Sequence, residues 1–126
     1  MRPTVYMTIP MGLNEEFMKK EYVQVVTTLS NKEDADRLAR HLVEQRLAAC
    51  VQVGGPLTSY YQWQGELETA QEYQVQIKSR LDLFGALAEE ISKHHPYETP
   101  EILALPIVTG SADYLDWLDK ELRTSP

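Results

Sequence analysis

His94 and His95 are the only clustered histidines in this 126-residue sequence, and they are the first candidates for chemistry. Neutral imidazole is a favoured ligand of borderline ions such as copper(II) or zinc(II), so the pair is a candidate metal site. Pro96 follows directly and keeps His95 extended, and neighbouring side chains of an extended segment point to opposite sides. The alternative is a purely structural role at a helix C-terminus, where imidazole favours the negative end of the helix dipole.

Cys50 is the only cysteine, which excludes an internal disulfide framework and any CxxC metal or redox motif. Its neighbours in the segment 47–51 are apolar, and an apolar setting disfavours the thiolate. We therefore expect Cys50 to be an inert, buried hydrophobe. No GxSxG, HExxH or glycine-rich phosphate motif occurs, and we expect the protein not to be an enzyme.

A second group of residues is a candidate for a cleft that binds a small anionic molecule. These cleft candidates are Lys78, Tyr97, Glu98 and Glu101. Three of them lie in or beside the segment 95–100, which two prolines make extended and stiff. Most charged side chains of a soluble protein are simply solvated, and that remains the alternative for each of these.

The overall charge restricts the possible partners. Twelve Lys and Arg against nineteen Asp and Glu give a net charge of −7, which argues against binding to nucleic acid or to anionic membranes. No apolar run approaches the roughly 18 residues of a membrane span. Residues 1–20 show no clear period and contain Pro3, Pro10 and Gly12, so we predict a flexible N-terminal extension followed by one folded domain over 21–126.

The elements that position these residues begin with a strand over 22–28, which is rich in β-branched and aromatic residues. Ser30 and Glu33 match a capping box, and apolar residues then recur at helical spacing from 35 to 47. A second helix opens at 79–82 and ends before His94. A strand over 102–108 contains Pro106, which predicts an edge or bulge position, and a third helix starts at 110–111.

A long hairpin lies between the first two helices. Its predicted arms, 49–62 and 66–79, flank a turn at Gln64-Gly65, and a bulge or bend is expected at 54–56. Each arm would span about 46 Å at ~3.3 Å per residue, whereas a compact domain of this size is roughly 36 Å across. The tip should overhang its own sheet and pair with a neighbouring copy. Its aromatic residues, which we assign to that interface rather than to a ligand cage, are Tyr60, Tyr61 and Trp63.

The resulting order is β-α-β-β-α-β followed by a helix. With right-handed crossovers, it predicts an α+β ferredoxin-like sandwich, in which a four-stranded antiparallel sheet carries two helices on one face.

Several segments together resemble the CutA family of divalent-cation tolerance proteins. They are LAACV at 47–51, TSYYQWQGE at 58–66, IKSR at 77–80, HPYETPEI at 95–102 and LP at 105–106. The resemblance extends in unbroken order over about residues 22–122. It implies a cytoplasmic, tight homotrimer similar in architecture to the PII signalling proteins, with the long hairpin pairing across subunits.

The resemblance also implies an association with tolerance to copper and other divalent ions. The copper ligands of the family correspond to His94 and His95 here, together with a cysteine of the first strand. This sequence has Thr27 at the cysteine position. Without that soft ligand, we predict weak binding that prefers Cu(II) to Cu(I), and no required cofactor. The alternative function is a PII-like sensor that binds an anionic metabolite in clefts between subunits.

Overall fold

The computed structural model describes residues 14–19 and 21–124 of the chain. Its elements are α1 (Glu15–Lys19), β1 (Tyr22–Leu29), α2 (Lys32–Glu44), β2 (Cys50–Trp63), β3 (Glu66–Arg80), the short 3-10 helix η1 (Leu81–Leu83), α3 (Phe84–His94), β4 (Leu103–Pro106) and α4 (Ala112–Glu121). The strands form one antiparallel sheet in the order β2-β3-β1-β4. The predicted α+β architecture with a four-stranded antiparallel sheet is confirmed.

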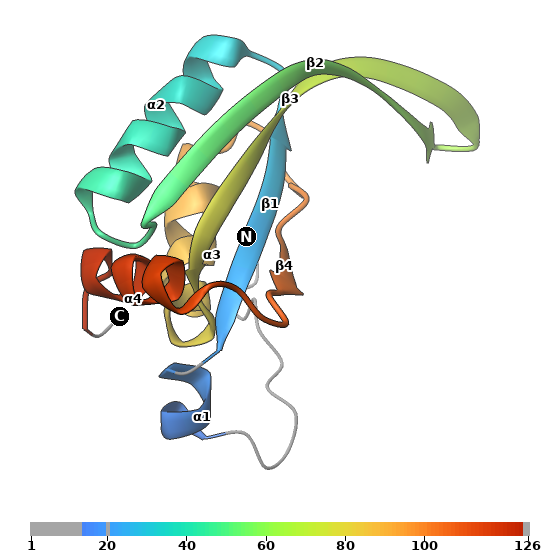
Figure 1. The fold of residues 1–126 in the computed structure, drawn as a ribbon. Coiled ribbons are helices and arrows are strands. Elements are labelled where there is room, and N and C mark those ends of the chain that lie inside the picture. Colours follow the sequence, from blue (N-terminus) through green and yellow to red (C-terminus); the bar gives the residue numbers. More distant parts are fainter. Residues whose placement is uncertain (1–13, 20, 125–126) are drawn as a thin grey trace.

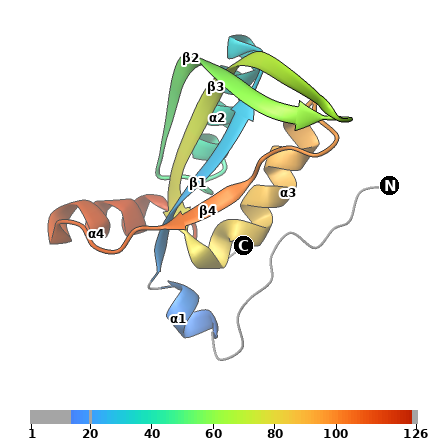
Figure 2. The ribbon, with the colours of Figure 1, turned by 90° about the vertical axis from the view of Figure 1, so that its right-hand side faces the viewer.

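Helices α2 and α3 lie against the same face of the sheet (Figures 1 and 2). The side chains of β1 alternate, so that Val25 and Leu29 are fully buried against this helical layer. Leu38 of α2 and Leu87 of α3 belong to the same core cluster. The two predicted helices are present, because helical spacing of apolar residues is the pattern that buries one face of a helix. Helix α2 ends at Glu44, however, and Leu47, the last residue of the predicted stripe, reaches the core from beyond the helix.

Three local predictions need correction. Asn31, not Ser30, caps α2, because the Asn31 side chain accepts a hydrogen bond from the backbone N–H of Asp34 at 3.1 Å. Strand β3 continues through Arg80, so the second helical segment starts only at Leu81. Cys50 is half-buried rather than buried, because it starts β2 beside Val51, which is the neighbour that packs against the core.

The long hairpin is confirmed. Strands β2 and β3 are 14 and 15 residues long, and they arch away from the rest of the sheet in Figure 1. The register shifts between Gly54 and Leu57, as expected for a bulge. At Gly55, φ is +131° and an added Cβ would lie 2.9 Å from the carbonyl oxygen of Glu72, so only glycine fits. Positive φ values at Gln64 and Gly65 close the two-residue turn.

Strand β4 pairs with β1, and it forms one edge of the described sheet, which agrees with the edge position predicted from Pro106. The predicted N-terminal extension falls mostly on residues 1–13 and 20, which lie outside the described part of the chain. Within it, the described residues 15–19 form α1, and Asn14 accepts a hydrogen bond from the backbone N–H of Phe17. Among the described residues, no helix has the length and apolar character that a membrane span requires.

Candidate metal centre between helices α2 and α3

The two adjacent histidines have different surroundings. His95 is buried, and its Nε2 lies 2.7 Å from the backbone oxygen of Thr28. A carbonyl only accepts, so Nε2 carries the proton, and Nδ1 accepts a hydrogen bond from the backbone N–H of Tyr97 at 3.2 Å. Both ring nitrogens of His95 are therefore engaged within the protein.

His94, by contrast, is exposed at the end of α3, where its ring lies next to the ring of His41 from α2. The two ring centroids are 4.5 Å apart. Glu90 stands one helical turn before His94, on the same side of α3. The candidate ligand atoms of His41, Glu90 and His94 all lie within 4.8 Å of one another. A two-helix cluster of two imidazoles and one carboxylate is thus the strongest metal-ligating group in the described part of the chain.

The carboxylate of Glu90 is shared between two cationic or potentially cationic partners. Nε2 of His41 lies 2.7 Å from Oε1, and the ammonium of Lys93 donates to Oε2 at 2.9 Å. These hydrogen bonds, first from His41 and then from Lys93, lower the pKa of Glu90 below its ordinary value. Glu90 is therefore ionised at neutral pH, as a metal ligand must be.

The donor set defines the chemistry. Two imidazole nitrogens and one carboxylate oxygen suit zinc(II) and copper(II), whereas magnesium and calcium prefer oxygen ligands alone. Ligands bound about 2.1 Å from a tetrahedral ion lie roughly 3.4 Å apart, so His41 and Glu90 need to separate only slightly to admit the metal. The exposed side of His94 leaves room for water to complete the coordination.

A second polar cluster surrounds Tyr97, one of the predicted cleft residues. Its hydroxyl donates to Oε2 of Glu72 at 2.9 Å, and its ring centroid lies 4.8 Å from that of His95. Glu72 belongs to β3 and is only 8% exposed. Burial, followed by the bond to Glu72, raises the pKa of the Tyr97 phenol. This cluster joins the segment after α3 to the base of the hairpin.

The other predicted cleft residues have separate environments within one chain. Lys78 donates to the side-chain oxygen of Gln52 at 2.9 Å, across the β2–β3 pair. Glu98 and Glu101 are exposed beyond α3. The aromatic residues at the hairpin tip are also exposed, at 70% for Tyr60, 45% for Tyr61 and 59% for Trp63.

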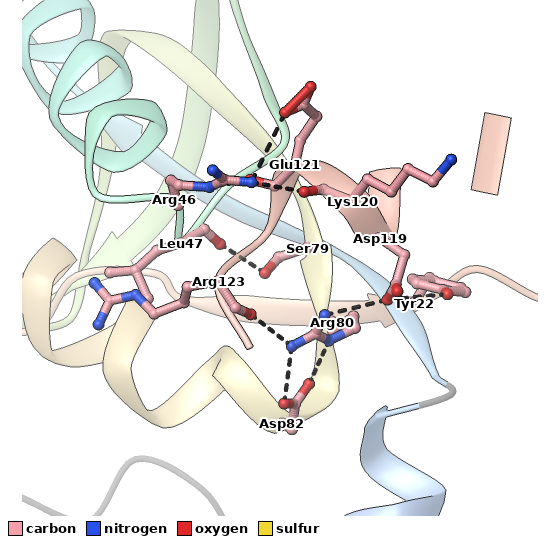
Figure 3. Close-up of polar contacts among 10 residues, drawn as sticks. All are labelled: Tyr22, Arg46, Leu47, Ser79, Arg80, Asp82, Asp119, Lys120, Glu121 and Arg123. Atoms are coloured by element: carbon pink, nitrogen blue, oxygen red, sulfur yellow. Dashed lines mark hydrogen bonds and ion pairs between the residues drawn. The ribbon is translucent and has the colours of Figure 1, made fainter. Parts of the chain in front are cut away.

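Arg80, a further cation near Lys78, is committed to the fold. Its guanidinium binds Asp82 through two hydrogen bonds of 2.8 and 3.1 Å and also reaches Asp119 of α4 (Figure 3). The hydroxyl of Tyr22 donates to the same Asp119 carboxylate at 3.3 Å. Arg80 is 5% exposed, so it anchors α4 rather than offering a charge to a ligand.

The sequence analysis missed His41 and Glu90 as site residues. One signal for Glu90 was present, since its spacing of four from His94 places both side chains on one face of a helix. No local signal exists for His41, which is more than fifty residues away from His94 in the sequence. It joins the site because α2 and α3 pack side by side on the sheet.

Comparisons with known proteins agree with this architecture. The model of the CutA1 divalent ion tolerance protein family matches residues 23–121. The divalent-cation tolerance protein CutA of Thermus thermophilus is 47% identical over 94 residues, which cover 75% of this chain and 91% of that protein. Protein CutA 1, chloroplastic, of Oryza sativa is 40% identical over 103 residues. These cover 82% of this chain but only 58% of the length of that relative.

Solved structures give the same result. The crystal structure of CutA1 from Oryza sativa matches with a TM-score of 0.81 and 39% sequence identity, covering 83% of this chain and 96% of that chain. The family match spans α2, α3, α4 and the whole sheet except Tyr22, the first residue of β1, and so includes every element that positions the His41–Glu90–His94 cluster. The chain belongs to the CutA1 divalent ion tolerance protein family.

Proposed function

We propose that this protein acts in divalent-cation tolerance by binding copper(II) or zinc(II) between α2 and α3, without catalysing a reaction. The observation that carries the proposal is the cluster of His41, Glu90 and His94, whose ligand atoms lie within 4.8 Å of one another. The name of its family supports the association with divalent ions. Imidazole and carboxylate ligands without a thiolate favour Cu(II) over Cu(I).

His94, rather than His95, is the histidine that this proposal assigns to the metal. The ring nitrogens of His95 are occupied by Thr28 and Tyr97, whereas His94 is exposed beside a second imidazole. Binding is expected to be weak, because Glu90 is the single anionic ligand and already has hydrogen-bond partners. Protons compete with metals for imidazole nitrogen, so the affinity falls on acidification.

Calorimetric titration with Cu(II) and Zn(II) tests the proposal. We expect one ion per chain, and a loss of affinity of at least about tenfold in His41→Ala and in His94→Ala. Cys50→Ala is the matched control, since it removes the one thiol of the chain and should leave binding unchanged. Unaltered affinity in both histidine variants would contradict the assignment.

We also propose that the subunit is ferredoxin-like and assembles as a homotrimer. The strand order β2-β3-β1-β4 with α2 and α3 on one face supports the first part. The second part is supported by apolar side chains left exposed on the single chain, both at the hairpin tip and on β4. On β4, Leu103 is 56% and Leu105 is 47% exposed. Exposed apolar strand surface of this kind is typical of an interface.

A further inference from the structure

Lys93 contacts the proposed metal ligand Glu90 from the same helix. Its ammonium lies 2.9 Å from Oε2, while His41 occupies Oε1. The Lys93 side chain is 65% exposed, so its ammonium can move away from Glu90 into solvent. Lys93 thus pairs with the second oxygen of the carboxylate that the proposal assigns to the metal.

This contact has two consequences for an incoming divalent ion. Lys93 donates a hydrogen bond to Oε2 of Glu90, so only the other carboxylate oxygen is available to a metal ion beside the two imidazoles. The lysine charge also cancels that of Glu90, the one anionic member of the cluster. A metal ion must therefore either displace the ammonium or accept a positive charge a few ångströms away.

We propose that Lys93 is an internal competitor that lowers the affinity of the His41–Glu90–His94 site for divalent metal ions. This inference rests on the proposed metal-binding function and assigns its regulation to one side chain. A site held weak in this way is loaded only when the metal concentration rises, which is the behaviour that a response to excess metal requires. The imidazoles determine which metal ions bind, and Lys93 sets the metal concentration at which the site fills.

Lys93→Met tests the inference, because methionine keeps an unbranched side chain and high helix propensity while removing the charge. We expect Zn(II) and Cu(II) to bind about three- to tenfold more tightly to this variant, with the difference shrinking at high salt as the lysine charge is screened. Lys93→Arg retains the charge and should bind like the wild type. Each affinity is measured by calorimetric titration with the metal salt alone.

Lys32→Met is the matched control. Lys32 forms an equally short helical ion pair with Asp36, at 2.9 Å, and its side chain is 62% exposed. It lies nine residues before His41 on α2, about 13 Å along the helix, which exceeds the screening length of about 10 Å at 0.1 M salt. Its removal should therefore leave metal affinity unchanged.

The outcomes separate the two proposals. Equal metal affinity in the wild type and Lys93→Met would overturn the role of Lys93 while leaving the metal site intact. An equal gain in Lys32→Met would also overturn it, because the effect would then come from net charge alone. Absence of binding in all variants would overturn the metal site itself and, with it, this inference.

Discussion

At the scale of single residues, hydrogen bonding distinguishes two neighbouring histidines that the sequence presents as a pair. His95 is held by a backbone acceptor and a backbone donor, which fix its tautomer and turn it into a structural link between β1 and the segment after α3. His94 keeps a solvent-facing ring next to His41. The same residue type thus serves the fold at one position and remains available to a metal at the next.

The hydrogen bond between the half-buried Tyr97 and the buried Glu72 gives a prediction at this scale. Tyr97→Phe removes the hydroxyl that donates to Glu72 and leaves a carboxylate that is 8% exposed without that bond. We expect a loss of about 1–3 kcal/mol in the free energy of unfolding at pH 8. Chemical denaturation measures it, with Tyr114→Phe on the exposed side of α4 as a control that should cost little.

The pH dependence of this loss follows from the raised pKa of Tyr97. A group whose pKa is higher in the folded state stabilises the fold fully below its unfolded pKa, near 10, and loses that contribution as the pH rises through the folded value. The stability difference between wild type and Tyr97→Phe should therefore shrink at strongly alkaline pH. A difference that stays constant across that range would contradict the hydrogen bond as its cause.

At the scale of elements, two arginines join the C-terminal ends of α2 and α4. Arg46 donates to the backbone oxygens of Lys120 and Glu121 at 2.6 and 3.0 Å, and Arg123 donates to that of Gln45 at 3.1 Å (Figure 3 shows the Arg46 contacts). The last carbonyls of a helix lack partners within it and carry partial negative charge. Each helix end is thus completed by a cation from the segment that follows the other helix.

This exchange predicts that Arg46→Gln lowers the free energy of unfolding by about 1 kcal/mol. Arg37→Gln is a suitable control, because Arg37 forms only an exposed ion pair with Asp34 on α2, and such pairs contribute about 0.5 kcal/mol or less. Urea denaturation of the two variants measures the difference. Equal stability of both would show that the contacts of Arg46 contribute nothing beyond a surface charge.

The sequence predicted the elements that depend on local patterns, but not the contacts that depend on how helices pack. The strand over 22–28, the hairpin and the turn at Gln64-Gly65 were predictable because periodic burial and turn chemistry are local properties. The cap of α2 was misassigned by one residue because Ser30 and Asn31 are both good caps, and only the backbone conformation decides between them. The proximity of His41 to Glu90 depends on how α2 packs against α3, and no local sequence pattern encodes that packing.

At the scale of the whole molecule, the long hairpin leaves the aromatic residues at its tip largely exposed in the single chain. Tyr60 and Trp63 are 70% and 59% exposed, which is unusual for large aromatic side chains. A second copy that covers them would remove this apolar surface from water. The homotrimer implied by the resemblance to the CutA family remains a prediction.

Light scattering at micromolar concentration tests the homotrimer, and we expect three times the chain mass of 14.4 kDa. Trp117→Phe leaves Trp63 as the sole tryptophan, so its fluorescence reports on the hairpin tip. We expect Trp63 to be shielded from an aqueous quencher in the assembly, although it is 59% exposed in the single chain. A monomer mass with an accessible Trp63 would contradict the assembly.

The central claim is that His41 and His94, from two different helices, bind the same metal ion. Electron paramagnetic resonance of the protein loaded with one equivalent of Cu(II) measures this directly, because imidazole nitrogens couple to the unpaired electron of the metal. We predict coupling from two imidazoles in the wild type and from one imidazole in His41→Ala. A wild-type spectrum without imidazole coupling, or one that His41→Ala leaves unchanged, would contradict the claim.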